Sequence, residues 1–184
     1  DSEEEDVLEI LTQTFEEKTK NILTEDNLEK AGLTKEQAVI FASMVEREVS
    51  KEEDRPIVAG ILIKRWREGM KLDVDATTQY SVVPRRLCNG QTFCVPSMEN
   101  ISSFNWWPKD LTEEELKTND PYNTRVIVGL PPAPICNPGL SAILSVLNYE
   151  NTPYYYYLTG KDGVTRYAKT ISEHNQNIAK YLTD

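Results

Sequence analysis

A glutamate on the apolar side of an expected helix is the side chain of this sequence best suited to acid–base chemistry. A Thr-x-x-Gln capping box, Thr34 to Gln37, opens a run without Gly or Pro and predicts a helix that extends to residue 49. The helical positions i, i+3, i+4 and i+7, which share one side, are Phe41, Met44, Val45 and Glu48. A carboxylate held against Phe and Met loses hydration, which raises its pKa and lets it keep a proton near neutral pH. A general acid needs that property.

The second glutamate of this segment has a different environment. Glu46 belongs to another side of the helix, near Val39 and Ala42, so the two glutamates need not share a role. The same pattern also fits an amphipathic helix whose glutamates are both solvated. Periodicity alone leaves these two interpretations open.

Composition excludes several other chemistries. A net charge of −10 without a basic stripe argues against a nucleic-acid partner. The sequence has a single histidine, His174, and no Cys-x-x-Cys pair, so we expect no metal site. It also contains no nucleophile-elbow serine and no glycine-rich phosphate loop. Carboxylate chemistry is what remains.

The order of the expected elements predicts an α+β fold that is mostly helical. Besides the Glu48 helix, helices are expected over about residues 3–21, 25–31, 56–69, 138–147 and 171–182, the last opened by a second capping box at Thr170 and Glu173. A late β-hairpin is expected from strands at 154–159 and 164–169. Residues 81–120 form a long, loop-rich insertion with little periodicity. Runs of helices followed by one hairpin are typical of an α+β domain.

The cysteines suggest one short cross-link. Cys88 and Cys94 flank an Asn89-Gly90 turn and are spaced to close a disulfide loop in an oxidising compartment. Cys136 is left over.

A series of short motifs makes the chain resemble a known family. In order they are Ala42-Ser-Met-Val-Glu-Arg-Glu48, Asp54-Arg55, Arg65-Trp-Arg-Glu-Gly-Met-Lys-Leu72 leading to Asp75, Tyr122-Asn-Thr124, Gly129-Leu-Pro-Pro132, Ile135-Cys-Asn-Pro-Gly139 and Glu173-His-Asn175. Each is weak alone, but their order and spacing over residues 33–182 resemble the catalytic domain of the YceG-like (MltG) endolytic murein transglycosylases. The resemblance divides the chain into an N-terminal helical appendage, residues 1–32, and a YceG-like catalytic domain, residues 33–184.

The resemblance implies a lytic transglycosylase that cuts the β-1,4 bond between N-acetylmuramic acid and N-acetylglucosamine in nascent peptidoglycan. In the family the second glutamate of the Glu-x-Glu pair is catalytic, and by position that residue is Glu48. It would protonate the glycosidic oxygen and then, as a base, deprotonate the sugar's own 6-hydroxyl, which closes a 1,6-anhydro ring. No cofactor or metal is required. The implied partners are peptidoglycan glycan strands and cell-wall synthases.

The matched motifs also supply the expected substrate-binding residues: Tyr122, Asn123, Thr124, Asp75, Glu46, Arg55, His174 and Asn175. Several of them have a structural alternative. Residues 122–124 also fit a turn, and Asp75 fits the cap of a helix that opens at Ala76. Arg55 fits an ion pair with Glu46 or Glu48, or a surface position. His174 fits a helix-surface residue packed on the tyrosine-rich strand.

The sequence also bears on location. It begins at Asp1 without Met and contains no apolar run long enough to span a membrane. With the resemblance, this leads us to expect an excised piece of a bacterial envelope protein. We expect that protein to act outside the cytoplasmic membrane and to be anchored by one helix absent from this chain.

Two departures from the family pattern keep alternatives open. A histidine usual in the late hairpin is absent from Gly163-Val-Thr-Arg-Tyr167, and the insertion carries Trp106 and Trp107, which suit sugar stacking or buried packing. A catalytically silent glycan-binding or scaffolding module of the cell-wall synthesis machinery is therefore one alternative. Another is an ordinary hydrolase that pairs Glu48 with Asp73 or Asp75 and leaves reducing ends.

Overall fold

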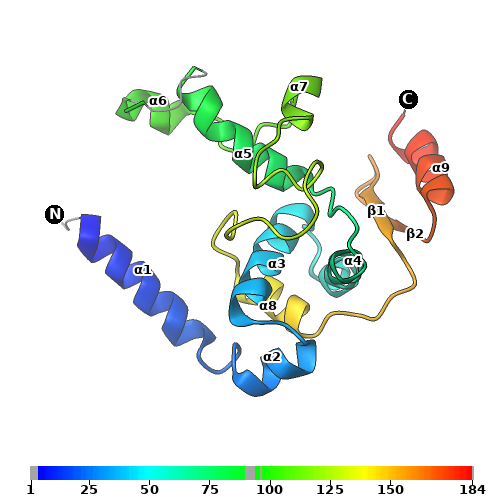
Figure 1. The fold of residues 1–184 in the computed structure, drawn as a ribbon, viewed down its shortest axis with the longest axis horizontal. Coiled ribbons are helices and arrows are strands. Elements are labelled where there is room, and N and C mark those ends of the chain that lie inside the picture. The colour runs from blue at the N-terminus through cyan, green and yellow to red at the C-terminus, as the bar shows by residue number, and fades with distance from the viewer. Residues whose placement is uncertain (1–3, 90–93, 96, 184) are drawn as a thin grey trace.

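A computed structural model describes residues 4–89, 94–95 and 97–183. Its elements, in chain order, are α1 (Glu4–Thr19), α2 (Glu25–Ala31), α3 (Lys35–Glu48), a 3-10 turn η1 (Glu52–Asp54), α4 (Arg55–Arg67), α5 (Asp75–Leu87), α6 (Met98–Ser103), α7 (Glu113–Leu116), α8 (Leu140–Leu147), β1 (Tyr156–Thr159), β2 (Thr165–Ala168) and α9 (Ile171–Tyr181). Helices dominate and the strands form one antiparallel pair, which confirms the predicted α+β class (Figure 1).

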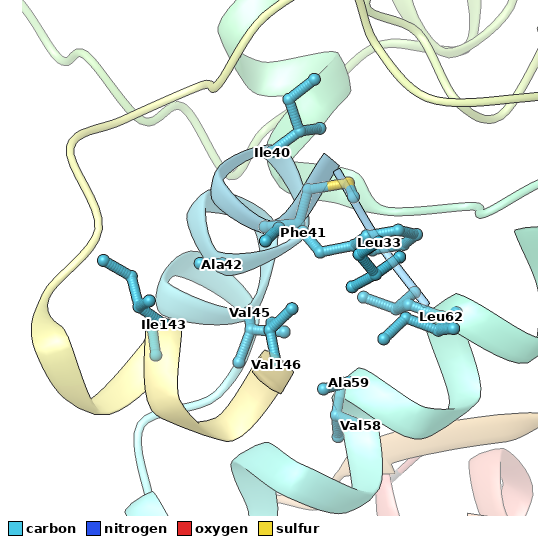
Figure 2. Close-up of a cluster of buried hydrophobic side chains, with 14 of the residues drawn as sticks. Leu33, Ile40, Phe41, Ala42, Val45, Val58, Ala59, Leu62, Ile143 and Val146 are labelled. Carbon is cyan, nitrogen blue, oxygen red and sulfur yellow. The ribbon is translucent and has the colours of Figure 1, made fainter. Parts of the chain in front are cut away.

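Helices α3, α4 and α8 pack together at the centre and form the core (Figure 1). Figure 2 shows Phe41 and Val45 of α3 directed toward Leu62 and Val58 of α4, with Val146 of α8 beside them. All five side chains are fully buried. The apolar side predicted for the Glu48 helix therefore faces the core, and the end of that helix is rigidly held.

The local signals that start and end the first core helices are present. Thr34 and Gln37 form the expected reciprocal capping box at the start of α3. Gly32 ends α2 in the left-handed conformation with φ of 64°, which glycine adopts without strain. These two signals lie two residues apart, so α2 ends and α3 begins within a short connection.

The insertion is more ordered than predicted. Helix α5 continues through Pro84 to Leu87, although residues 81–87 were expected to be loop. Val82 and Val83 are buried, and Arg86 near the end of the helix is ion-paired with Asp110 and Glu115. Tertiary contacts therefore compensate for the hydrogen bond that Pro84 cannot donate. A further capping box at Thr112, absent from the prediction, opens the short helix α7.

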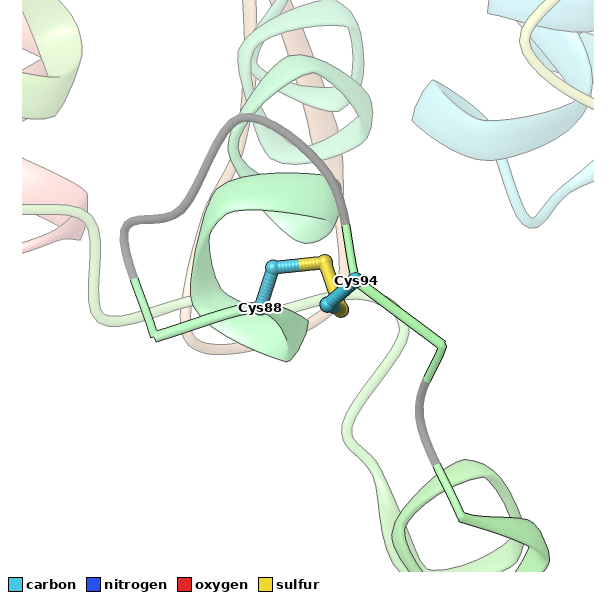
Figure 3. Close-up of a disulfide and its surroundings, with 2 residues drawn as sticks. All are labelled: Cys88 and Cys94. Atoms are coloured by element: carbon cyan, nitrogen blue, oxygen red, sulfur yellow. A yellow bond between two sulfur atoms is a disulfide. The ribbon is translucent and has the colours of Figure 1, made fainter.

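A disulfide joins Cys88 and Cys94 at the end of α5 (Figure 3), with their Cα atoms 5.5 Å apart. It ties the first residue after the helix to the insertion. The Asn89-Gly90 turn expected between them falls partly outside the described residues.

Helix α8 begins later than the sequence suggests. Asn137 and Pro138 were expected as the cap and first residue, but the first helical residue is Leu140 and the cap position is Gly139. The Gly139 N–H donates a hydrogen bond to the Glu46 carboxylate at 3.1 Å. A side chain from α3 therefore takes the place of the cap that was expected from Asn137.

The apolar side of α1 is not buried by this chain. Val7, Leu8, Ile10 and Leu11 are 45–61% exposed, and α1 extends away from the helical core (Figure 1). Phe15, nearer the end of the helix, packs against the core.

The hairpin is short and is held by the last helix. Strand β1 pairs with β2 from Tyr156–Ala168 to Thr159–Thr165, and α9 packs against both strands (Figure 1). Thr170 caps α9 as predicted by accepting the Glu173 N–H, but the Glu173 carboxylate accepts from Lys169, so the second capping box is only half formed. Tyr167 of β2 donates to Asp54, which fixes the hairpin against the start of α4.

Gly60→Ala is expected to destabilise the protein by about 1–3 kcal/mol, as overpacking of a core does. A Cβ atom at Gly60 would lie 1.9 Å from the backbone oxygen of Glu150, whose N–H donates to Pro56. Alanine favours a helix more than glycine does, by roughly 1 kcal/mol, so the sign tests the clash directly. Urea unfolding followed by circular dichroism measures the difference. Stability equal to or above that of the wild type would contradict the close approach.

Candidate active site

Glu48 ends α3 with both carboxylate oxygens hydrogen-bonded. The Tyr157 hydroxyl donates to Oε2 at 3.0 Å, and the backbone N–H of Ala76 donates to Oε1 at 3.3 Å. Tyr157 lies in β1 and Ala76 in the first turn of α5, so three elements distant in sequence meet at this carboxylate. The helical periodicity identified Glu48 but neither of its two partners.

The environment of Glu48 raises its pKa above the ordinary carboxyl value, as predicted. Burial is the largest cause, and the nearby negative charge of Asp75 adds to it. The hydrogen bonds from Tyr157 and Ala76 and the charge of Arg125 act in the opposite direction. Because burial outweighs these donors, Glu48 retains its proton more readily than a solvated glutamate.

Glu48 lines a polar pocket of about 300 Å³. The other lining residues come from α4, the segment after it, the start of α5, one loop and strand β1: Arg65, Leu72, Asp73, Asp75, Arg125, Tyr156, Tyr157, Leu158 and Thr159. The pocket therefore combines one protonatable acid with two further carboxylates, two guanidinium groups and two tyrosines. Such a site suits a ligand rich in hydroxyl and amide groups.

Each additional carboxylate of the pocket is paired with an arginine. Asp73 lies 3.4 Å from Arg65, and Asp75 forms a close ion pair with Arg125. Asp75 was expected to bind substrate, with the cap of a helix opening at Ala76 as the structural alternative. In the structure α5 begins at Asp75 itself and Val74 occupies the cap position without a side-chain bond. The structure therefore corrects the capping role and places the Asp75 carboxylate on the pocket wall.

Thr124 stabilises the start of α5 through hydrogen bonds. Its side-chain oxygen accepts the Val74 N–H at 3.1 Å and lies 2.8 Å from the Thr77 hydroxyl, while its carbonyl accepts the Asp73 N–H. These bonds fix the backbone that presents Ala76 to Glu48. Asp73 is in the left-handed region with φ of 59°, and the bonds help to hold that unusual conformation.

Asn123 connects the same region to the insertion. Its side-chain oxygen accepts from Thr78 and from the Arg125 N–H, and its amide donates to the carbonyls of Leu116 and Thr118. Asn123 and Thr124 are both fully buried. Neither side chain reaches the surface in this conformation, so the structure gives them positioning contacts rather than the substrate contacts that were expected.

Tyr122 differs from the two residues that follow it. It is half-buried, its ring packs 4.8 Å from that of Tyr80, and it is not among the residues that line the pocket. Its N–H donates to Asp120, which is the turn alternative considered for this motif.

Glu46 and Arg55 form a separate structural pair. Arg55 donates to Glu46 at 3.2 Å and to the Val49 carbonyl, and Glu46 also caps α8 through Gly139. Neither residue lines the Glu48 pocket. Of the two pairings considered for Arg55, the structure shows the one with Glu46.

The Glu173-His-Asn175 motif lies on α9, which packs against the hairpin. His174 stacks on Tyr156, a residue of the pocket wall, with ring centroids 5.3 Å apart. Burial and the charge of Arg65 lower the pKa of His174, which favours the neutral ring. His174 therefore supports the wall from outside, as its packing alternative predicted, while Asn175 is exposed on the helix surface.

Within residues 4–89, 94–95 and 97–183, no group of three or more His, Cys, Asp or Glu side chains is arranged to hold a metal ion. The helices of that same part include none that is long and apolar enough to cross a membrane.

Comparison with known proteins supports what the geometry suggests. The model of the YceG-like family matches residues 1–180. The chain belongs to the YceG-like family. The match runs through residues 1–32 as well, and the proposed division at residue 32 stays a prediction.

Two curated relatives carry an enzyme name. An "Endolytic murein transglycosylase" of Bacillus subtilis is 26% identical over 156 residues, which cover 85% of this chain and 37% of the relative. A protein of the same name from Streptococcus pneumoniae is 28% identical over 159 residues, covering 84% of this chain and 25% of the relative. The chain thus spans between a quarter and two fifths of these relatives' lengths.

A solved structure shares the fold. The 2.6 Å crystal structure of a YceG-like protein from Listeria monocytogenes matches with a TM-score of 0.66 and 27% sequence identity. The match covers 90% of this chain and 46% of that protein.

The stability of a Glu48→Gln variant is expected to exceed that of the wild type increasingly as pH rises. Because the folded-state pKa of Glu48 is raised, its contribution to stability is fully present below the unfolded carboxyl pKa of about 4.3 and is lost as pH rises through the folded value. Glutamine accepts the Tyr157 hydrogen bond without carrying a charge. Chemical unfolding of both proteins from pH 4 to pH 8 measures the difference between their free energies of unfolding. A difference that becomes smaller as pH rises would contradict the raised pKa of Glu48.

Tyr157→Phe is expected to raise the pKa of Glu48 further, and so to move the part of a pH–activity profile that follows the titration of Glu48 to higher pH. The Tyr157 hydrogen bond lowers the pKa of Glu48, so its removal raises that pKa further. Tyr155→Phe is the matched control, because the Tyr155 hydroxyl donates to Glu68 instead. The pH dependence of kcat/KM gives this apparent pKa. An apparent pKa that is unchanged in Tyr157→Phe would contradict its assignment to Glu48.

Proposed function

We propose that this chain is the catalytic domain of a lytic transglycosylase that cleaves the β-1,4 bond between N-acetylmuramic acid and N-acetylglucosamine in nascent peptidoglycan. The observation that carries the proposal is the Glu48 carboxyl group, which lines a polar pocket and has a raised pKa. The name shared by the curated relatives supports the same reaction class.

The first step uses the raised pKa. A protonated Glu48 donates its proton to the glycosidic oxygen as the bond to C1 breaks, and positive charge develops on the sugar ring. The carboxylates of Asp73 and Asp75, each paired with an arginine, give the pocket acceptors for sugar hydroxyl and N-acetyl N–H groups.

The second step uses the two donors. Once Glu48 has lost its proton, Tyr157 and Ala76 stabilise the carboxylate, which then takes the proton of the muramic acid 6-hydroxyl. The 6-oxygen attacks C1 and closes the 1,6-anhydro ring. One carboxyl group thereby acts as acid and then as base, and no second catalytic carboxylate is needed.

A hydrolase that recruits Asp73 or Asp75 is the second candidate, because both carboxylates line the same pocket. The ion pairs of Asp73 with Arg65 and of Asp75 with Arg125 favour a structural or substrate-orienting role over activation of water. In the proposed reaction Asp75 raises the pKa of Glu48 through its charge.

The wider setting is also a proposal. We expect the protein to act on the extracytoplasmic side of the bacterial cytoplasmic membrane, on strands supplied by cell-wall synthases that associate with it. The alternative of a silent glycan-binding or scaffolding module predicts binding without cleavage.

The test is mass spectrometry of the products from uncrosslinked glycan strands incubated with the wild type and with Glu48→Gln. We expect 1,6-anhydromuramyl ends from the wild type and none from the variant. Reducing ends would identify a hydrolase. Binding without cleavage by a folded wild type would identify the silent module.

A further inference from the structure

Another pocket, of about 430 Å³, is lined by residues of α5, of the insertion and of the segment before α8. In contrast to the polar catalytic pocket, its lining is aromatic and aliphatic: Tyr80, Val83, Pro84, Trp106, Trp107 and Ile135. Trp106 is 44% exposed and Tyr80 37% exposed, so two large rings of this apolar pocket remain open to solvent. We call these six residues the aromatic groove.

Helix α5 contributes side chains to both the catalytic pocket and the aromatic groove. Ala76, whose N–H binds Glu48, shares one side of this helix with Tyr80 and Val83 at i, i+4 and i+7. At 1.5 Å per residue, Tyr80 and Val83 lie about 6 Å and 10 Å further along the helix axis. That offset is on the scale of successive rings in a β-1,4-linked glycan.

A second link runs through α3. Arg47, the residue before Glu48, places its guanidinium 3.7 Å from the ring centroid of Trp107. Ile135, another lining residue, donates its N–H to the Ser43 hydroxyl oxygen one turn earlier on α3. The helix that carries the catalytic acid thus also fixes two walls of the aromatic groove.

The rings are held in place before any ligand binds. Trp106 packs edge-on against Phe104 at 5.5 Å, Trp107 lies under Arg47, and Tyr80 packs against Tyr122 at 4.8 Å. Rings that are already oriented lose little conformational entropy on binding, which favours recognition of a rigid, flat ligand.

The geometry points to a glycan subsite: we propose that the aromatic groove binds N-acetylhexosamine rings of the strand whose scissile bond lies at Glu48. The apolar C–H faces of pyranose rings and the acetamido methyl groups match aromatic walls. A stem peptide is a poorer match, because its carboxylates would meet an apolar lining on a protein with a net charge of −10. This inference rests on the proposed function for its choice of ligand.

The test measures binding to the inactive Glu48→Gln protein, so that it remains readable even if the wild type proves not to cleave glycan. The ligands are β-1,4-linked N-acetylglucosamine oligomers, a disaccharide and a hexasaccharide, measured by isothermal titration calorimetry. In this background we compare Trp106→Ala, Tyr80→Ala, the ring-retaining Trp106→Phe and, as a surface control, Leu8→Ala on α1.

We expect Trp106→Ala and Tyr80→Ala each to weaken hexasaccharide binding by about tenfold, as loss of an aromatic contact does, and to leave disaccharide binding unchanged. Trp106→Phe and Leu8→Ala should bind the hexasaccharide within about twofold of the parent protein. Unchanged hexasaccharide binding in both alanine variants, with thermal unfolding confirming that they are folded, would overturn the glycan subsite. A free stem peptide that binds the parent protein but not Trp106→Ala would overturn it in favour of a peptide site.

Discussion

Glu48→Gln is expected to lower the rate of glycan cleavage by about 10²–10⁴-fold, the contribution of one positioned acid–base group. Glutamine keeps the shape of the side chain and still accepts the Tyr157 hydroxyl, so the pocket should keep its form. What is lost is the proton that must pass to the leaving oxygen and the carboxylate that must take one back. Turnover of uncrosslinked glycan strands, followed by chromatography of the released fragments, measures the effect.

Glu46→Gln is the matched control for this loss. It changes the same residue type two positions away, in a side chain that pairs with Arg55 and caps α8 outside the pocket. We expect its cleavage rate to stay within about tenfold of the wild type, because its ion pair contributes to folding and not to proton transfer. Equal losses in the two variants would contradict the assignment of the acid to Glu48.

Asn123→Leu is expected to destabilise the protein by about 3 kcal/mol or more, because each buried group left without its hydrogen-bond partner costs about 1–3 kcal/mol. Asn123 is fully buried and bonds to Thr78, Arg125, Leu116 and Thr118. Leucine has a similar size but leaves these buried groups without their partner. Urea unfolding monitored by tryptophan fluorescence measures the change.

The matched control is Asn119→Ala, an exposed asparagine in the same loop, which we expect to change stability by less than about 0.5 kcal/mol. Asn123→Leu should also reduce cleavage at temperatures where it remains folded, because the start of α5 and Arg125 lose their anchor. A stable and fully active Asn123→Leu protein would contradict the positioning role given to this residue.

The helix that carries Glu48 and the raised pKa of this residue could be predicted from the sequence because their signal is local. The capping box at Thr34 and the helical spacing of Phe41, Met44 and Glu48 lie within fifteen residues, and the helix they predict is the one observed. The raised pKa followed from the same pattern, although the structure shows the nearest hydrogen-bond donors to be Tyr157 and Ala76.

The walls of the pocket could not be predicted in the same way, because they depend on pairings between distant segments. Tyr157 lies 109 residues from Glu48, and Arg125 lies 50 residues from Asp75. A run of four tyrosines predicts a strand, but the side of the hairpin that faces α3 is set by tertiary packing. The resemblance also drew attention to Asn123 and Thr124 without distinguishing contact with substrate from support of the backbone.

The insertion was the least predictable part for a different reason. Pro84 is a strong local signal against a helix, yet α5 passes through it because buried valines and the Arg86 ion pairs hold its last turn. Trp106 and Trp107 of the aromatic groove lie outside any helix or strand and have no periodic signature. Trp106 and Trp107 were noted for their residue type alone, and their placement near α5 follows from the folded insertion.

Cleavage in water enriched in ¹⁸O tests the central proposal most directly. A lytic transglycosylase uses the sugar's own 6-hydroxyl as nucleophile, so the muramyl products of the wild type should carry no ¹⁸O and should end in a 1,6-anhydro ring. Incorporation of one ¹⁸O at the new end of each product, by a wild-type protein whose activity is lost in Glu48→Gln, would contradict the proposal and show that Glu48 serves a hydrolase.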